Sequence, residues 1–181
     1  MLAITTDGTL VRLDRRGTII WKADVGAGVA SSPACDEERD LVVFGAKNGF
    51  VHGLALSRGT RVWRFPADSA VDGSPLCGRD AIYIGSRNGT LYSLSFDGTL
   101  RWKRDVGGPV HSKPLIAGAA VFVTTYAAEL VAVDAASGEP AGEYRAASPI
   151  YSSPGTDGKR LYFGSNGGVF HAVRLGAPTA S

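Results

Sequence analysis

The chain has 181 residues, enough for one domain that buries roughly 70% of its unfolded surface. Its formal net charge is +2 and its 19 basic residues are scattered, which excludes the basic stripe typical of nucleic-acid-binding proteins. No apolar run is long enough for a transmembrane helix, and the first residues lack the basic and apolar regions of a signal peptide.

One short phrase recurs four times along the chain and defines a repeat. Its copies are Val29-Ala-Ser-Ser-Pro33, Val71-Asp-Gly-Ser-Pro75, Val110-His-Ser-Lys-Pro114 and Ile150-Tyr-Ser-Ser-Pro154. The copies start 42, 39 and 40 residues apart. A period near 40 residues with short β-like segments indicates a repeat array.

Each full repeat is predicted to contain four short strands joined by tight turns. In the copy that starts at Val71, the expected strands are 71–77, 81–85, 90–95 and 99–104. Asn88-Gly89 and Asp97-Gly98 are hairpin signals, because both residue pairs favour the tight turns that connect antiparallel strands. Four strands connected in this way form one blade of a β-propeller.

The ends of the chain do not complete a blade. The first repeat begins at its second strand, 2–5, and the last repeat stops after its third strand, 169–173. With three full blades between them, the prediction is an all-β propeller array of 18 strands, or about 4.5 four-stranded antiparallel blades. Because open sheet edges promote association, we expect a fragment of a larger propeller or a second copy that closes the ring. A small self-closed ring is the remaining alternative.

The turn between the second and third strands carries a glycine in most repeats. The predicted positions are Gly8, Gly49, Gly89 and Gly167. The fourth repeat has Tyr126-Ala-Ala-Glu129 instead, so its turn must use another geometry.

These residues resemble the pyrroloquinoline-quinone (PQQ) type of propeller repeat over essentially all of 1–181, as one array. The features that carry the resemblance are the glycine-to-tryptophan spacing (Gly59 with Trp63, Gly98 with Trp102), Gly85-Ser86 and Gly164-Ser165, and Leu91-Tyr92-Ser-Leu94. In that family each tryptophan docks between blades. The resemblance therefore implies a structural docking role for Trp21, Trp63, Trp102 and Tyr144.

The quinoprotein-like family contains both enzymes and binding scaffolds. Its dehydrogenases use PQQ with a Ca²⁺ ion and a catalytic aspartate, whereas an outer-membrane assembly lipoprotein and kinase sensor domains bind no quinone. No catalytic residue, metal ligand or cofactor site can be placed here, so we expect a non-catalytic scaffold for a protein or small ligand. A remnant or fragment of a PQQ-dependent dehydrogenase is the alternative. The resemblance favours a periplasmic or secreted protein, although the chain shows no export signal.

Candidate binding residues occupy slots that vary between otherwise similar repeats. The position after the repeat valine holds Ala30, Asp72, His111 and Tyr151. Lys113 replaces a serine found in the other three copies. We expect this stretch near the rim of the central channel, and we predict a ligand-binding surface of Asp72, His111, Lys113 and Tyr151. A merely solvated rim is the alternative.

Other reactive side chains are expected to be structural. His52 and His171 occupy the third-strand slot of Tyr92, which is an aromatic packing position. Cys35 and Cys77 occupy equivalent slots in neighbouring repeats and are predicted to be small buried hydrophobes. A disulfide between them would need their backbones within about 7 Å.

Overall fold

The computed structural model describes residues 1–176 and forms 18 strands in five separate antiparallel sheets, here blades 1 to 5 in chain order. Blade 1 contains β1 (Leu2–Ile4), β2 (Thr9–Leu13) and β3 (Ile19–Asp24). Blade 2 contains β4 (Ala34–Asp36), β5 (Leu41–Gly45), β6 (Phe50–Ala55) and β7 (Arg61–Pro66). Blade 3 contains β8 (Leu76–Cys77), β9 (Ile82–Gly85), β10 (Thr90–Leu94) and β11 (Leu100–Asp105). Blade 4 contains β12 (Leu115–Ala117), β13 (Ala120–Thr124), β14 (Glu129–Asp134) and β15 (Pro140–Arg145). Blade 5 contains β16 (Gly155–Thr156), β17 (Arg160–Gly164) and β18 (Phe170–Arg174).

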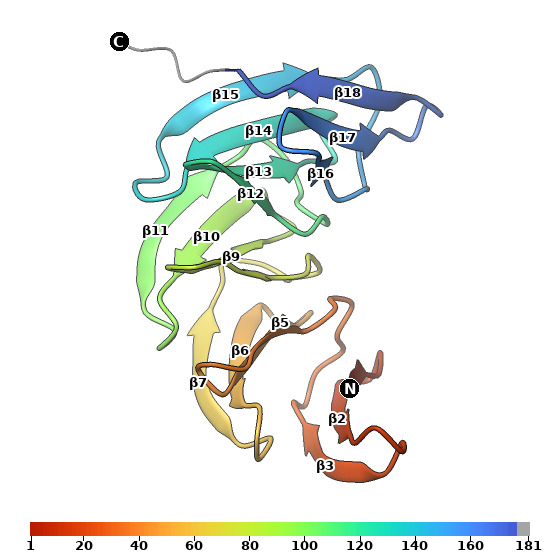
Figure 1. The fold of residues 1–181 in the computed structure, drawn as a ribbon, viewed down its shortest axis with the longest axis vertical. Coiled ribbons are helices and arrows are strands. Elements are labelled where there is room, and N and C mark those ends of the chain that lie inside the picture. The colour runs from red at the N-terminus through yellow and green to blue at the C-terminus, as the bar shows by residue number, and fades with distance from the viewer. Residues whose placement is uncertain (177–181) are drawn as a thin grey trace.

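The blades follow one another along an arc that is open on one side (Figure 1). In each full blade the strands pair in sequence order, and β7, β11 and β15 lie on the outer side of the arc. The prediction of a partial, all-β propeller with 18 strands is confirmed.

In blades 2 to 5 the first strand begins only after the repeat proline, so it is shorter than predicted. In blade 3, the segment expected as strand 71–77 forms only β8, while Val71 to Pro75 is a linker. The Val71 N–H donates to the Ala46 carbonyl of blade 2 at 3.1 Å, and the Val110 N–H donates to the Ser86 carbonyl of blade 3 at 3.1 Å. The linker therefore cannot join its own sheet, because its hydrogen bonds are made to the preceding blade.

Cores form between blades, and the repeat valines seal them. Val71 and Val110 are fully buried. A side chain at Gly45 would come within 2.2 Å of Val71, and one at Gly85 within 2.3 Å of Val110. The glycine that ends the second strand thus leaves the space into which the next repeat's valine fits.

The turn before the third strand requires a left-handed residue in every blade. In blade 5 that residue is Gly168, with φ 77°, and not the predicted Gly167. In blade 4 it is Ala128, with φ 69°, which adopts the conformation that glycine holds in the sister turns. The prediction that the turn of the fourth repeat uses another geometry is therefore wrong: the turn keeps the geometry of its sisters, and only the residue differs.

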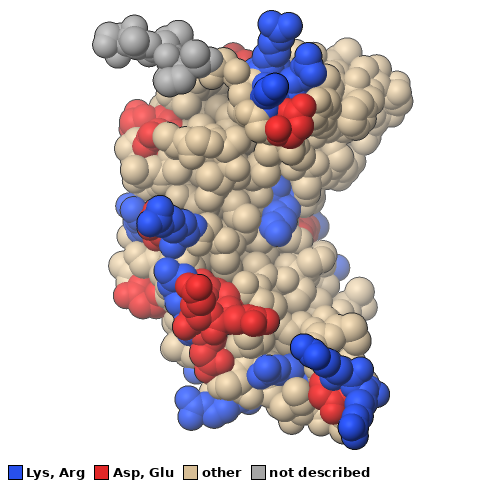
Figure 2. All heavy atoms as spheres, in the orientation of Figure 1, with Lys and Arg blue, Asp and Glu red and all other residues tan. Residues whose placement is uncertain are grey.

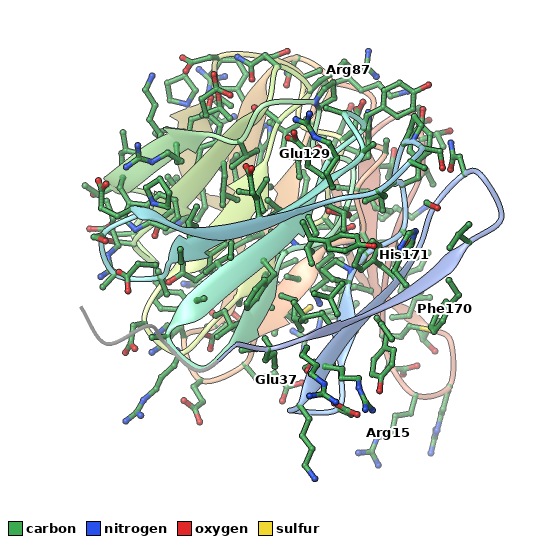
Figure 3. The ribbon with its side chains drawn as sticks, turned by 90° about the horizontal axis from the view of Figure 1, so that it is seen from above. Arg15, Glu37, Arg87, Glu129, Phe170 and His171 are labelled. Atoms are coloured by element: carbon green, nitrogen blue, oxygen red, sulfur yellow. The ribbon has the colours of Figure 1, made fainter. Side chains whose placement is uncertain are left out.

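The two faces of the arc carry different connections. The linkers between blades and the turns between second and third strands lie on one face, here called the linker face, because the strands alternate in direction. Figure 3, which looks across the arc, shows Arg87 of the turn between β9 and β10 and Glu129 at the start of β14 on one side of the molecule. Glu37 and Arg15, from turns of the opposite face, lie on the other side. Nothing in residues 1–176 forms the long apolar helix that crosses a bilayer.

Candidate functional site

The linker face brings together three of the four predicted binding residues. The Nδ1 atom of His111 lies 4.0 Å from Oδ2 of Asp72. The rings of His111 and Tyr151 lie 5.4 Å apart between centroids. These residues come from three consecutive linkers, so the repeated register of the linkers is what places them in one row.

Two further residues complete this group, here called the rim cluster: Asp72, Arg87, His111, Tyr126 and Tyr151. Arg87 donates to Oδ2 of Asp72 through both Nε, at 2.9 Å, and a terminal nitrogen. The Tyr126 ring lies 4.8 Å from the Tyr151 ring and 6.5 Å from the His111 ring, between centroids.

Sequence reasoning missed Arg87 and Tyr126 because both belong to the turns between second and third strands. Each holds the same place in its turn: the Arg87 N–H donates to the Ala70 carbonyl, and the Tyr126 N–H donates to the Pro109 carbonyl, both at 2.8 Å. Aligning these turns would have shown a second variable slot on the same face.

The polar half of the rim cluster is held in place, and its aromatic half faces solvent. The Asp72 side chain is only 8% exposed, and its Oδ1 atom has no hydrogen-bond partner among the described residues. Tyr126 and Tyr151 are 42% and 48% exposed. The adjacent Tyr126 hydroxyl, and to a lesser degree burial, raises the pKa of Tyr151, so the Tyr151 phenol stays neutral near pH 7.

Lys113 lies apart from this group. Its backbone N–H donates to Ser153 Oγ at 2.9 Å, and its side chain is exposed. Its ammonium group makes no hydrogen bond or ion pair within residues 1–176, and its charge acts on the Cys77 thiol. Lys113 therefore lies closer to the inner strands of the blades than the residues of the rim cluster do.

Three tryptophans join neighbouring blades in one recurring arrangement. The Nε1–H groups of Trp21, Trp63 and Trp102 donate to the carbonyls of Leu56, Phe96 and Ala135 at 3.0, 2.8 and 3.2 Å. Each ring also lies on a turn glycine of the next blade: Gly59, Gly98 and Gly138 respectively.

Tyr144 lies at the contact between blades 4 and 5 but does not occupy the tryptophan register. Trp102 pairs with Ser93, and the corresponding pair in blade 4 is Gly142 with Ala132, so Tyr144 is two residues too late. It instead packs on Phe163 at 5.9 Å between centroids, and its hydroxyl contacts Nδ1 of His171 at 3.2 Å.

The remaining histidines pack in the third strand. His52 is 2% exposed and stacks on Phe44, and burial lowers its pKa to about 4. The same stacking joins His171 to Phe163, but there Nε2 contacts Ser165 Oγ at 3.0 Å. The corresponding atom of His52 has no partner among the described residues.

The prediction of two buried cysteines is wrong for Cys35, which is exposed, while Cys77 is half-buried. Both thiols are free. Cys35 is exposed because it lies on the short β4 strand at the inner side of the array, where no further layer covers it. Burial raises the pKa of Cys77 to about 11, so this thiol is protonated and unreactive at neutral pH.

On the face drawn in Figure 2, the charged side chains do not form a single patch. Figure 2 shows basic and acidic side chains in small interspersed groups, with much of this face uncharged. Within residues 1–176, no three His, Cys, Asp or Glu side chains gather as they would around a metal ion.

Comparison with known proteins identifies relatives along most of the chain. Residues 47–176 match the family described as "Outer membrane protein assembly factor BamB". A protein of that name from Burkholderia pseudomallei is 29% identical over 126 residues, which cover 70% of this chain and 33% of the relative. Another, from Legionella pneumophila, is 26% identical over 182 residues, which cover 94% of this chain and 47% of the relative. The chain thus spans between a third and a half of the length of these curated relatives.

Solved structures show the same fold. The crystal structure of BamB from Moraxella catarrhalis superposes with a TM-score of 0.84 at 20% identity, covering 96% of this chain and 54% of that chain. The computationally designed Ika8 protein superposes with a TM-score of 0.86 at 13% identity, covering 96% of this chain and 55% of that chain. At such low identities these likenesses show the fold alone.

Proposed function

Because the chain belongs to the family described as outer membrane protein assembly factor BamB, we propose that it is a non-catalytic scaffold in outer-membrane protein assembly. In this proposal the rim cluster binds a protein partner within the cell envelope. The observation that carries the proposal is the pair of exposed, adjacent rings of Tyr126 and Tyr151 on the linker face.

The chemistry of the rim cluster suits a protein interface. Tyrosine and arginine are the residue types that most often dominate binding energy, because each offers a large, partly apolar contact with a polar end. Here Asp72 holds the Arg87 guanidinium in place, which reduces the ordering cost that Arg87 would otherwise meet on binding. The two tyrosines then add apolar area beside a fixed, oriented charge.

The dehydrogenase alternative requires a site for a metal ion and a quinone. A Ca²⁺-bound quinone would need several carboxylate or amide oxygens around one ion, and no cluster of three or more His, Cys, Asp or Glu exists within 1–176. The carboxylate of Asp72 is already paired with Arg87. We propose a scaffold that works without PQQ or Ca²⁺, to be tested by Ca²⁺-dependent dye reduction in the presence of added PQQ.

Blades 1 and 5 each have three strands within the described residues, whereas blades 2 to 4 have four. Within the described residues, β1 and β18 each pair with a strand on one side only. We propose that further strands complete these blades, and a second copy of the chain is one source. Light scattering tests whether a second copy supplies these strands. A stable dimer supports this source, and a monomer at high concentration rules it out.

The test of the rim cluster is a double substitution, Tyr126→Ala with Tyr151→Ala. Affinity for the assembly-machinery partner should fall by roughly 30-fold, because truncating a central aromatic pair typically costs about 2 kcal/mol. The matched control is Val62→Ala, which removes an apolar side chain that is 61% exposed elsewhere on the surface. Equal affinity in the double variant and the control would overturn the proposal.

A further inference from the structure

The contact between blades 4 and 5 lacks the tryptophan that fills each of the three preceding contacts. The register places Gly142 opposite Ala132, where the earlier blades pair Trp63 with Gly53 and Trp102 with Ser93. Gly142 has φ 155°, a backbone conformation that favours glycine. A side chain from this position therefore does not fill the contact, and the backbone is not shaped to carry one.

A cavity of about 1050 Å³ lies where the tryptophan ring would be. Its apolar wall includes Phe122, Leu130, Ala132, Leu161 and Val173. The mouth of the cavity is formed by turn residues on the face opposite the linker face, away from the rim cluster. The volume lies just above the upper end of the range of small-molecule sites, which are typically about 300–1,000 Å³, so a small ligand fills only part of it.

The hydrogen-bond acceptor used by the earlier tryptophans has a counterpart in blade 5. Two of the three acceptor residues are anchored alike: the Leu56 N–H donates to the Asp40 carbonyl at 2.9 Å, and the Ala135 N–H to the Ala119 carbonyl at 2.8 Å. The Leu175 N–H donates in the same way to the Lys159 carbonyl at 3.0 Å. Leu175 also lines the cavity, so its carbonyl stands at the position that receives an indole N–H in the other contacts.

We propose that this cavity is a binding site for a small, flat aromatic molecule that carries an N–H donor, with indole as the simplest member of the class. Three equivalent contacts in the same chain hold an indole ring between an apolar wall and a carbonyl acceptor. The fourth keeps the wall and the acceptor but lacks the indole, and the Tyr144 ring, which also lines the cavity, packs on Phe163. A ligand of this class would restore the contact that blades 1 to 4 make internally.

The first experiment titrates a fluorinated indole into the intact protein and follows the ligand by fluorine NMR. We expect saturable binding with a dissociation constant on the order of 1 mM or tighter, as for a ligand of this size. The variant Ala132→Leu should weaken binding at least tenfold, because its side chain fills the cavity. Ala30→Leu makes the same change at an exposed linker-face residue and should bind like the wild type.

A second variant tests the same idea in the opposite direction. Trp102→Ala opens an equivalent space between blades 3 and 4, so it should bind two indoles per chain and regain thermal stability as indole is added. No saturable binding to the wild-type protein would overturn the proposal, and so would equal binding by Ala132→Leu. These outcomes are independent of the rim cluster, because none of the three substitutions changes one of its residues.

Discussion

Replacing His52 with phenylalanine should make the protein less sensitive to mild acid. His52 is 2% exposed, stacks on Phe44 and leaves Nε2 without a partner among the described residues. Burial, followed by the positive charges of Arg61 and Arg64, lowers its pKa to about 4. The folded protein therefore keeps this imidazole neutral through a pH range in which the unfolded chain takes up a proton.

The sign of the effect follows from that difference. In the unfolded chain the pKa is about 6.5, so above that pH His52 has no effect on the pH dependence of stability. Between pH 6.5 and about 4 the unfolded state binds more protons, and the free energy of unfolding falls as the pH is lowered. Below about pH 4 the folded state is protonated as well, and the loss stops.

The size of the loss has an upper limit set by the two pKa values. A difference of about 2.5 corresponds to about 3 kcal/mol at 1.36 kcal/mol for each pH unit. We expect about 1–2 kcal/mol, because Arg61 and Arg64 lie at the surface, where solvent screens their charges. The carboxylates of low pKa, such as Asp40 and Asp97, add their own loss only below about pH 4.

The assay is urea unfolding of wild type and His52→Phe at several pH values between about 7.5 and 4.5. The stability of the two proteins should approach each other, or cross in favour of the variant, as the pH falls. His171→Phe serves as the control, because it leaves His52 and its acid response in place. The reasoning is refuted if wild type and His52→Phe lose the same free energy over this range.

Three further predictions concern single positions, of which the first two break the pattern of their sister blades and the third follows it. Ala46→Ser should stabilise the fold by about 1 kcal/mol. In blade 5 the equivalent residue, Ser165, contacts Nε2 of His171, and a serine at position 46 would give the unpartnered Nε2 of His52 the same contact. An unchanged or lower melting temperature would contradict this prediction. Ala128→Gly should raise the free energy of unfolding, measured by chemical unfolding, by about 0.5–1 kcal/mol. Glycine adopts the left-handed φ of 69° without strain, and this gain exceeds the entropy cost of its greater freedom in the unfolded chain. A loss of stability would show that Ala128 is not strained. Trp63→Ala should lower the free energy of unfolding by about 3 kcal/mol in the same assay, because it removes the ring contact with Gly98 and the hydrogen bond to the Phe96 carbonyl. Val62→Ala, at the exposed neighbouring residue, should lower it by less than about 0.5 kcal/mol. Similar losses in both variants would exclude tryptophan docking as a source of stability.

The fold could be predicted from sequence to the level of strand number and blade order. The recurring valine-to-proline phrase and the turn glycines mark each blade, and both have local physical causes. The error at residues 71–75 has a different origin: the Val71 N–H finds its partner in the preceding blade. Such a bond cannot be read from a local pattern, because a linker and a strand share the same β-like residues.

The candidate site was only partly predictable for a similar reason. Comparing repeats in register singled out Asp72, His111 and Tyr151, which the structure brings together. Arg87 and Tyr126 lie 15 and 25 residues away from Asp72 and Tyr151 in sequence, and only the alternation of strand direction puts them on the same face.

The register of the outer strands was also invisible in the sequence. A shift in pairing follows the tryptophan pair in each outer strand, as between Ser93 and Leu94 in blade 3. The nearest aromatic residue in blade 4, Tyr144, therefore appeared to replace the tryptophan although Gly142 holds its place.

Site-specific crosslinking is the sharpest test of the proposal that the linker face binds a protein of the outer-membrane assembly machinery. A photo-reactive phenylalanine is placed at Tyr126 in the intact gene product, in the cells that make it, and at exposed Val62 as the control. We expect the Tyr126 probe to capture a defined outer-membrane assembly protein, the Val62 probe to capture none, and Tyr151→Ala to reduce the capture. Capture from both positions alike, or no assembly protein from Tyr126, would contradict it.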